Sequence, residues 1–523
     1  MMSFKRLSPA HKDIILKSHN EHMRNVLKCV DHNQEVLKRI VFYGLNVFGE
    51  EFAEKTRKIR QKRRPDPHYM SKVLSTMRQI VREWSVEGKP ERDATYAPVM
   101  ETLRKRYPDE NSRSSVKIMV PGSGLGRLAF DLAKEGFTVE GNEFSMIMLM
   151  TSSFLLNACY EEGPCCSSEV DDEIREAEKI LNAFLCYGLY GREMACRTMM
   201  SFKRLSPAHK DIILKSHNEH MRNVLKCVDH NQEVLKRIVF YGLNVFGEEF
   251  AEKTRKIRQK RRPDPHYMSK VLSTMRQIVR EWSVEGKPER DATYAPLMEA
   301  LRKRYPDENS RSSVKIMVPG SGLGRLAFDL AKEGFTVEGN EFSMIMLMTS
   351  SFLLNACYEE NEHVIYPYTL DKSNSWSYDD QTRPVYFPDI GKSRTDVPSN
   401  FSMIAGDFLE VTQSKSESFE CIVTAWFIDT AKSIIDYIET IYRLLKPGGC
   451  WLNVGPLTYH YEDMLDEMSI ELPYEEVIRI VRLTGFEVVR EERIISYYTI
   501  NRLSMLQNQY TCAFFEAIKP VNS

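Results

Sequence analysis

The spacing of apolar and polar residues divides the second half of the chain into a helical stretch and an alternating stretch. From 171 to about 305, apolar residues recur at helical spacing among many charges, most clearly over 208–247 and 267–285. From 314 onward, short apolar runs suited to buried parallel strands alternate with helical segments. These runs are VKIMVP (314–319), FTVEGNE (335–341), FSMIAGDF (401–408), CIVTAWFID (421–429) and CWLNVGP (450–456). Such alternation predicts a doubly wound α/β sheet.

The segments between and after these strands complete the predicted domain. Helices are expected after the first two strands, over 431–445 and from about Pro473. Two further apolar runs, FEVVREERI (486–494) and YTCAFFEAIK (510–519), predict a closing antiparallel pair. Residues 361–400 are rich in Tyr, Pro, Ser and Asp, and we expect an irregular loop or insertion there.

A long repeat determines the predicted domain organisation. Residues 1–162 recur as 199–360, with Val99 replaced by Leu297 and Thr102 by Ala300. Only the second copy continues into 361–523, which occurs once. The predicted parts are a partial duplicate (1–162), a junction with the first helix of the complete unit (163–198), a helical region (199–313) and an α/β domain (314–523). Copy one would contain helices and two strands, and we expect it to be non-functional, with an unpaired strand edge and uncovered apolar faces.

Composition excludes several classes of protein. The 523 residues carry a net charge of −1, so no global field favours nucleic acid or an anionic membrane. Eleven scattered cysteines give neither a disulfide framework nor a zinc site, and the N-terminal segment lacks the apolar core of a signal peptide. We therefore expect a cytoplasmic protein without a metal. The basic run KTRKIRQKRRP (253–263) reads as a solvated surface, with a nuclear-import signal as the alternative.

The order of motifs in the α/β stretch points to a nucleotide-like cofactor. Gly320, Gly322 and Gly324 follow a strand and open a helix, which lets the backbone approach a ligand closely. Glu341 ends the next strand, 17 residues beyond Gly324, where a carboxylate can accept ribose hydroxyls. Asp407 and Phe408 end a third strand, where a carboxylate can meet an exocyclic amine and a ring can stack on adenine. The spacing G-x-G-x-G disfavours a nicotinamide dehydrogenase.

This order, with LLKPGG before the fifth strand and a terminal antiparallel pair, resembles class I S-adenosylmethionine-dependent methyltransferases. The resemblance implies a Rossmann-like sheet of seven strands over 314–523 and S-adenosylmethionine as cofactor. One departure is Val318, where many members of the class carry an acidic residue.

A narrower resemblance covers nearly all of 171–523. The segments RQIVREWSVEGKPERDATY, VPGSGLGRLAFDLA, WFIDTAKSIIDYIETIYRLLKPGG, NVGPLTYHYED and YTINRLSM are similar to those of the carnosine N-methyltransferase family. That family methylates an imidazole nitrogen of histidine in small peptides and converts carnosine to anserine. Copy one resembles only the upstream part of the family, through the second strand and helix.

The family resemblance implies site residues by position. The expected cofactor-binding residues are Gln277, Arg280, Gly320, Gly322, Glu341, Asp407, Phe408 and Ala425. Arg280 is the natural partner for the methionine carboxylate, and Ala425 stands where the family often has Cys. The expected acceptor-binding residues are Asp429, His460, Tyr498 and Tyr510, with Asp429 and His460 as the catalytic pair. Asn508 stands where the family has another tyrosine near the substrate.

The chemistry leaves the individual roles open. Imidazole attacks only through a nitrogen with a free lone pair, so the site must hold the neutral ring in one tautomer or remove a proton. Asp429 could fix the tautomer or bind the peptide amine, and His460 could relay a proton or bind the substrate carboxylate. Each also has a structural alternative: Asp429 as a helix cap, His460 as a surface residue, and the two tyrosines as packing.

Two alternative functions and the oligomeric state stay open at this stage. One alternative is a methyltransferase for another acceptor, such as a protein histidine, and the other is a binding protein with a decayed site. A homodimer is among the candidate states, and a small histidine-containing peptide is the expected partner.

Overall fold

The computed structural model describes residues 67–157, 173–246, 263–391, 398–462, 464 and 467–521, with scattered residues between 26 and 41. The chain separates into two compact units with the boundary at 168/169, and each is described by itself. Most of the basic run at 253–263 lies outside the described residues, and so does the junction over 163–172. No helix in the described part of the chain combines the length and apolar character that a bilayer crossing requires.

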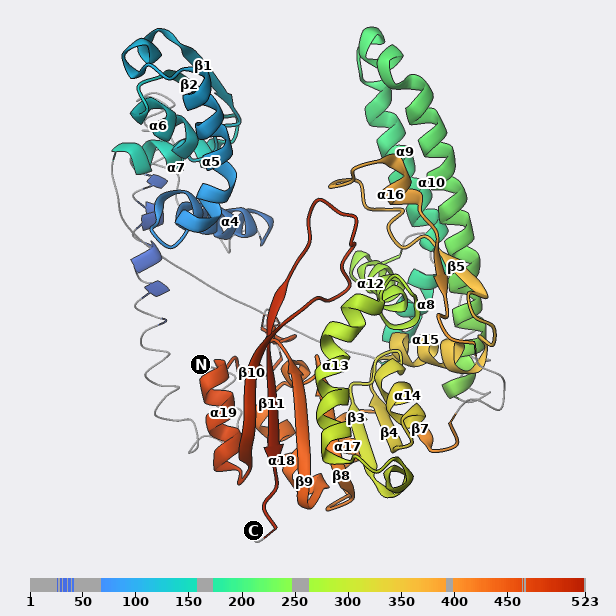
Figure 1. The fold of residues 1–523 in the computed structure, drawn as a ribbon. Helices are drawn as coiled ribbons and strands as arrows, with labels where there is room; N and C mark the ends of the chain where they lie inside the picture. Colours follow the sequence, from blue (N-terminus) through green and yellow to red (C-terminus); the bar gives the residue numbers. More distant parts are fainter. Residues whose placement is uncertain are drawn as a thin grey trace. The chain divides into compact units, whose positions relative to one another are not determined.

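The second unit is built around a seven-stranded mixed sheet, which confirms the predicted fold class (Figure 1). Its strand order is β10-β11-β9-β8-β3-β4-β7. The five strands from β9 to β7 are parallel, whereas β11 is antiparallel to both of its neighbours. The strands are β3 (Lys315–Pro319), β4 (Thr336–Glu341), β7 (Phe401–Ala405), β8 (Phe419–Ala425), β9 (Leu445–Gly455), β10 (Glu487–Ser496) and β11 (Tyr510–Ile518). The carboxyl ends of the parallel strands therefore share one edge, where ligands bind in such sheets.

Three predicted segments differ from the structure. Strand β8 ends at Ala425 rather than at Asp429, because Trp426 takes a left-handed conformation with φ of 57°. Strand β9 begins at Leu445, so the KPGG turn forms an irregularity within the strand pairing. The prediction of an irregular segment over 361–400 was wrong in part. It contains the antiparallel pair β5 (His363–Ile365) and β6 (Val385–Phe387) and the short helix α16 (Tyr378–Thr382).

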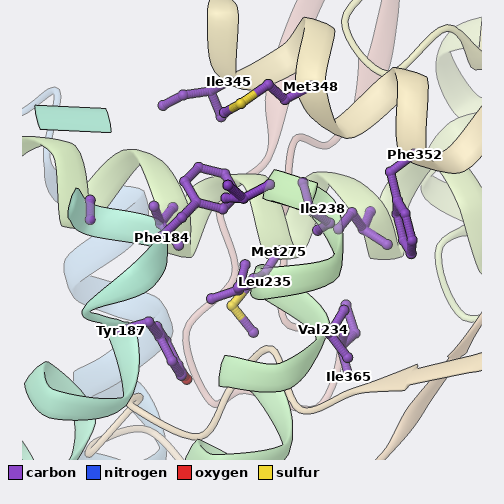
Figure 2. Packing of buried hydrophobic residues seen from close by; sticks show 14 of the residues in the cluster. Phe184, Tyr187, Val234, Leu235, Ile238, Met275, Ile345, Met348, Phe352 and Ile365 are labelled. Carbon is purple, nitrogen blue, oxygen red and sulfur yellow. The ribbon is translucent and has the colours of Figure 1, made fainter. Parts of the chain in front are cut away.

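Helices before the sheet form a core of their own with the helix that follows β4 (Figure 2). They are α8 (Glu173–Leu185), α9 (Tyr187–Lys203), α10 (Pro207–Gly242), α12 (Pro265–Trp282) and α15 (Met344–Asn355). Figure 2 shows Phe184 and Leu235 among the aliphatic and Met side chains that these helices bury together. Val234, Ile238, Ile345, Met348 and Phe352 belong to the same cluster. The Met-rich run after β4 is therefore core.

A second core lies against the sheet itself. Helices α13 (Lys287–Arg304) and α14 (Arg325–Lys332) pack on it with Leu297, Leu301 and Leu330, against buried side chains of β3, β8, β9 and β11. Helices α18 (Ile434–Leu444) and α19 (Tyr474–Leu483) follow β8 and β9 in sequence. Each is amphipathic and buries an apolar face rich in Ile or Val. Helix α13 is thus fixed against β8, β9 and β10, which follow it in sequence.

The first unit contains the same local elements without the rest of the sheet. They are α4 (Pro67–Trp84), α5 (Lys89–Arg106), β1 (Lys117–Pro121), α6 (Arg127–Lys134), β2 (Thr138–Asn142) and α7 (Met146–Asn157). Strands β1 and β2 form a two-stranded parallel sheet among the described residues. Met119 is 63% exposed and Phe130 37%, while the equivalent Met317 and Phe328 are fully buried. Identical sequence thus buries different amounts of surface, because among the described residues β3 has β8 beside it and Phe328 packs into the helical core.

Candidate functional site

The glycine-rich turn between β3 and α14 presents its backbone at the carboxyl edge of the sheet. Gly320 and Gly322 have φ of 64° and 54°, which side chains rarely adopt. A Cβ at Gly320 would lie 2.4 Å from Cδ2 of Phe427, whereas a Cβ at Gly322 would meet nothing within 4 Å. The turn is therefore packed against Phe427 at Gly320 and open to solvent space at Gly322. A ligand could approach the backbone closely at Gly322.

Glu341 holds this turn from the end of β4. Its Oε2 accepts the N–H of Gly322 at 2.8 Å, and its Oε1 accepts those of Phe342 and Ser343 at 2.8 and 2.7 Å. Burial raises the pKa of Glu341, and the three backbone hydrogen bonds oppose that rise. A carboxylate has about four acceptor positions. One therefore remains for a ligand hydroxyl.

Copy one contains the same carboxylate with the same three bonds. Glu143 accepts the N–H of Gly124 at 2.9 Å, of Phe144 at 2.8 Å and of Ser145 at 2.7 Å. Its pKa is lowered, because the hydrogen bond from Ser145 and the other two outweigh a smaller burial. The hydrogen-bonded turn is thus encoded in the repeated sequence. The stronger burial of the Glu341 carboxylate depends on residues that only the second copy has.

Arg280 lies near the C-terminal end of α12 and is 4% exposed. Its Nη1 donates to Glu281, and its Nη2 donates to Oγ1 of Thr293 at 3.3 Å. The guanidinium lies 5.2 Å from the ring centroid of Tyr498. Its Nε is buried without a hydrogen-bond partner, with Glu289 as an ionic neighbour at 3.5 Å. Arg280 therefore keeps donor capacity for a further carboxylate.

Gln277, one turn earlier on α12, points to the same place. Its Nε2 donates to the hydroxyl of Tyr498 at 2.8 Å. Its Oε1 is buried without a hydrogen-bond partner. A buried acceptor without a donor is costly, so this atom is suited to receive a donor such as the amine of an amino-acid ligand.

Asp407 and Phe408 follow β7, as predicted, but both are engaged by the protein itself. Oδ1 of Asp407 caps the short helix α17 (Phe408–Val411), accepting the N–H groups of Leu409 at 2.8 Å and Glu410 at 3.4 Å. The ring of Phe408 is 2% exposed and packs edge-on against Phe427 and Tyr437, with centroids 5.4 and 5.2 Å apart. Their contact with an adenine stays a prediction.

An aromatic cluster joins the end of β8 to the hairpin of β10 and β11. Trp426 directly follows Ala425, and its ring centroid lies 4.8 Å from that of Tyr498 and 5.0 Å from that of Tyr510. Its Nε1 donates to Oγ1 of Thr293 at 3.3 Å. The structure therefore brings Tyr498 and Tyr510 together with Gln277 and Arg280, although these residues are far apart in sequence.

Asp429 and His460 are linked through their backbones. Asp429 lies in the 3₁₀ helix η5 (Ile428–Thr430) and is 2% exposed. Its Oδ2 accepts the N–H and the hydroxyl of Thr458 at 2.9 and 2.7 Å. Its carbonyl accepts the N–H of His460 at 3.0 Å, while the His460 side chain is exposed. Asp429 therefore anchors the loop of His460, and the alternative of a helix cap is not what its contacts show.

Sequence reasoning missed three residues of this cluster: Thr293, Glu289 and Trp426. Thr293 bonds Arg280, Trp426 and, at 2.8 Å, the hydroxyl of Ser496. Trp426 lies inside the motif WFID, whose aspartate alone was singled out. No pattern in the sequence marks Thr293 or Glu289, because their importance comes from packing between α13 and the hairpin.

Comparisons with known proteins show which family the chain resembles. A family model described as carnosine N-methyltransferase matches residues 59–166 and 257–521, which is more than half of the chain and includes parts of both copies. A carnosine N-methyltransferase of Mus musculus is 41% identical over 389 residues, covering 73% of this chain and 96% of that protein. One of Schizosaccharomyces pombe is 38% identical over 354 residues, covering 64% of this chain and 94% of that protein.

Solved structures give weaker likenesses. The phosphoethanolamine N-methyltransferase 2 of Haemonchus contortus, in complex with S-adenosyl-L-methionine, has a TM-score of 0.29 at 16% identity, covering 49% of this chain and 58% of that one. The glycopeptide N-methyltransferase MtfA has a TM-score of 0.27 at 14% identity, covering 44% and 97%. The fold assignment therefore rests on the strand order described above.

Proposed function

Because this chain belongs to the carnosine N-methyltransferase family, we propose that it transfers a methyl group from S-adenosylmethionine to an imidazole nitrogen of carnosine. Related small histidine-containing peptides are acceptors of the same class. The observation that carries the proposal is the family match together with one cluster in which Gln277, Arg280, Tyr498 and Tyr510 converge. A protein histidine as acceptor is the alternative that the experiment below addresses.

The residues present fit the cofactor. When bound, S-adenosylmethionine supplies an electrophilic methyl group on a sulfonium. Arg280 has free donor capacity for its carboxylate, and the unpartnered Oε1 of Gln277 suits its amine. Glu341 keeps one acceptor position for a ribose hydroxyl, and Gly320 and Gly322 give close backbone approach. Asp407 and Phe408 are the proposed adenine contacts, and Ala425, where the family often has Cys, is left with its backbone alone for a cofactor contact.

On the acceptor side, the protein must hold a neutral imidazole in line with the methyl group. Tyr498 and Tyr510, with Trp426 between them, supply aromatic faces and hydroxyl groups for that ring. We assign Asp429 to tautomer selection or amine binding, because it is a buried carboxylate three residues after Trp426 in the motif WFID. The exposed His460 is suited to exchange a proton with solvent or to bind the peptide carboxylate.

We further propose that only the second copy forms this site. The first unit supplies equivalents of Arg280 and Glu341, namely Arg82 and Glu143. It has no equivalents of Trp426, Tyr498 or Tyr510, because these residues belong to the segment that occurs once.

Methyl transfer by the full chain tests the proposal. The chain is incubated with methyl-labelled S-adenosylmethionine and either carnosine, free histidine or a panel of histidine-containing proteins, and products are identified by mass spectrometry. Labelled methylcarnosine is expected, with the label on the imidazole. Label in proteins but in no dipeptide would overturn carnosine as the acceptor and favour the alternative.

A further inference from the structure

Glu289 is a buried carboxylate between the predicted cofactor residues and the predicted acceptor residues. It lies near the start of α13 and is 3% exposed. One of its sides faces Arg280, with Oε1 3.5 Å from Nε. The same Oε1 accepts the backbone N–H of Thr499, whose φ is 53°. Glu289 thus contacts the arginine of α12 and the turn that follows β10.

The turn that Glu289 holds carries Tyr498. The hydroxyl of Tyr498 accepts a hydrogen bond from Gln277, and its ring faces the Arg280 guanidinium. A non-glycine residue in the left-handed region, such as Thr499, persists only where its surroundings hold it. A carboxylate that accepts the N–H of that very residue supplies such a hold.

We propose that Glu289 is a positioning residue that couples the cofactor site to the acceptor site, by linking Arg280 to the Tyr498–Ile500 turn. This inference rests on the proposed function for the identity of the ligand that Arg280 binds. A ligand that immobilises Arg280 also immobilises Glu289 through their ion pair, and thereby the turn. The entropy cost of ordering the turn is then already met when the acceptor binds. Binding at one site therefore favours binding at the other.

The first copy supplies an internal comparison. Glu91 and Arg82 are the equivalents of Glu289 and Arg280, and their ion pair is present at 3.2 Å. The side chain of Glu91 is nevertheless 70% exposed, and that of Arg82 33%. The pair itself is therefore a local property of the repeated sequence. Burial and the contact to a turn are added only where residues 498–500 cover it.

Burial also sets the electrostatic state of this carboxylate. Desolvation raises the pKa of Glu289, and the charge of Arg280 with the N–H groups of Thr499 and Ile500 opposes the rise. Arg280, Glu281 and Glu289 together form a buried cluster with one cation and two carboxylates. Removing Glu289 would leave the N–H of Thr499 without this partner in a half-buried turn.

Amide hydrogen exchange of the full chain tests this coupling. Exchange of the peptide containing residues 498–500 is compared with and without saturating S-adenosylhomocysteine. The variants are Glu289→Ala, Glu289→Gln and the matched control Glu91→Ala. In the native chain the ligand is expected to slow exchange of this peptide about tenfold, the equivalent of one charge-assisted hydrogen bond. Glu91→Ala should behave like the native chain.

Glu289→Ala should bind the ligand yet lose this added protection, and Glu289→Gln, which keeps one acceptor oxygen, should show part of it. Full added protection in Glu289→Ala, or none in the native chain, would overturn the coupling. Loss of all ligand binding in Glu289→Gln would also overturn it, because Glu289 would then support Arg280 alone. If the alanine variant does not fold, the glutamine variant carries the test. A native chain that shows the protection but methylates no carnosine would refute the proposed function and leave the coupling standing.

Discussion

Replacing Glu341 by glutamine should weaken cofactor binding, and the first copy provides the control. In the second copy, the carboxylate accepts three backbone N–H groups and has one acceptor position left. Glu341→Gln preserves the shape of the side chain but replaces one oxygen by an NH₂ group. That group cannot accept from Gly322 or from a ribose hydroxyl.

The magnitude follows from the bonds that are lost. A hydrogen bond to a charged group contributes about 1.5–3 kcal/mol, and each 1.4 kcal/mol corresponds to tenfold in affinity. Loss of the single ligand bond therefore weakens binding about 10- to 150-fold. The loss of the bond to Gly322 loosens the turn and moves the result toward the upper end.

Isothermal titration of the full chain with S-adenosylhomocysteine measures this change. Glu143→Gln, at the equivalent position of copy one, replaces the oxygen that accepts the N–H of Gly124 and should leave the affinity as in the native chain. An equal loss of affinity in both variants, or a loss in Glu143→Gln alone, would refute the assignment of the cofactor to the second copy.

Three other changes separate packing, catalysis and ionisation. Met317→Ala, at a fully buried position, should lower the free energy of unfolding by about 2–5 kcal/mol, whereas Met119→Ala, at its exposed equivalent, should change it by less than about 0.5 kcal/mol in chemical denaturation. Asp429→Asn should lower kcat for carnosine about 100-fold or more and leave the affinity for S-adenosylhomocysteine unchanged, and normal turnover would rule out its proposed role. Burial raises the pKa of Glu341 above the 4.5 of an ordinary glutamate. The contribution of Glu341 to the free energy of unfolding should therefore fall as pH rises from 4.5 through its folded pKa. Glu341→Gln should remove that part of the pH dependence of unfolding.

The sequence predicted most strands of the sheet and their succession along the chain, because short apolar runs, glycine turns and the final antiparallel pair are local signals. The strand β3, the turn at Gly320 and Gly322, and Glu341 lie within 27 residues of one another and were placed from spacing alone. Their hydrogen bonds recur in copy one, which shows that they need no distant partner.

Contacts between distant segments could not be predicted in the same way. Glu289 and Thr499 are separated by 210 positions, and Thr293 and Ser496 by 203. The backbone of Trp426 ends β8 earlier than its apolar sequence suggested, since a left-handed residue interrupts the strand. The segment 361–400 looked irregular because its strands are only three residues long. The role of each acceptor residue likewise depends on tertiary packing rather than on spacing.

We expect a turn that is present twice in this chain to form a cofactor site once. Native mass spectrometry of the full chain, with S-adenosylhomocysteine at a concentration just sufficient to saturate the native site, counts the ligands bound to each 523-residue chain. One ligand per chain, with reduced occupancy in Glu341→Gln and full occupancy in Glu143→Gln, is the predicted result. Two ligands per chain, or one that disappears in Glu143→Gln, would contradict the account.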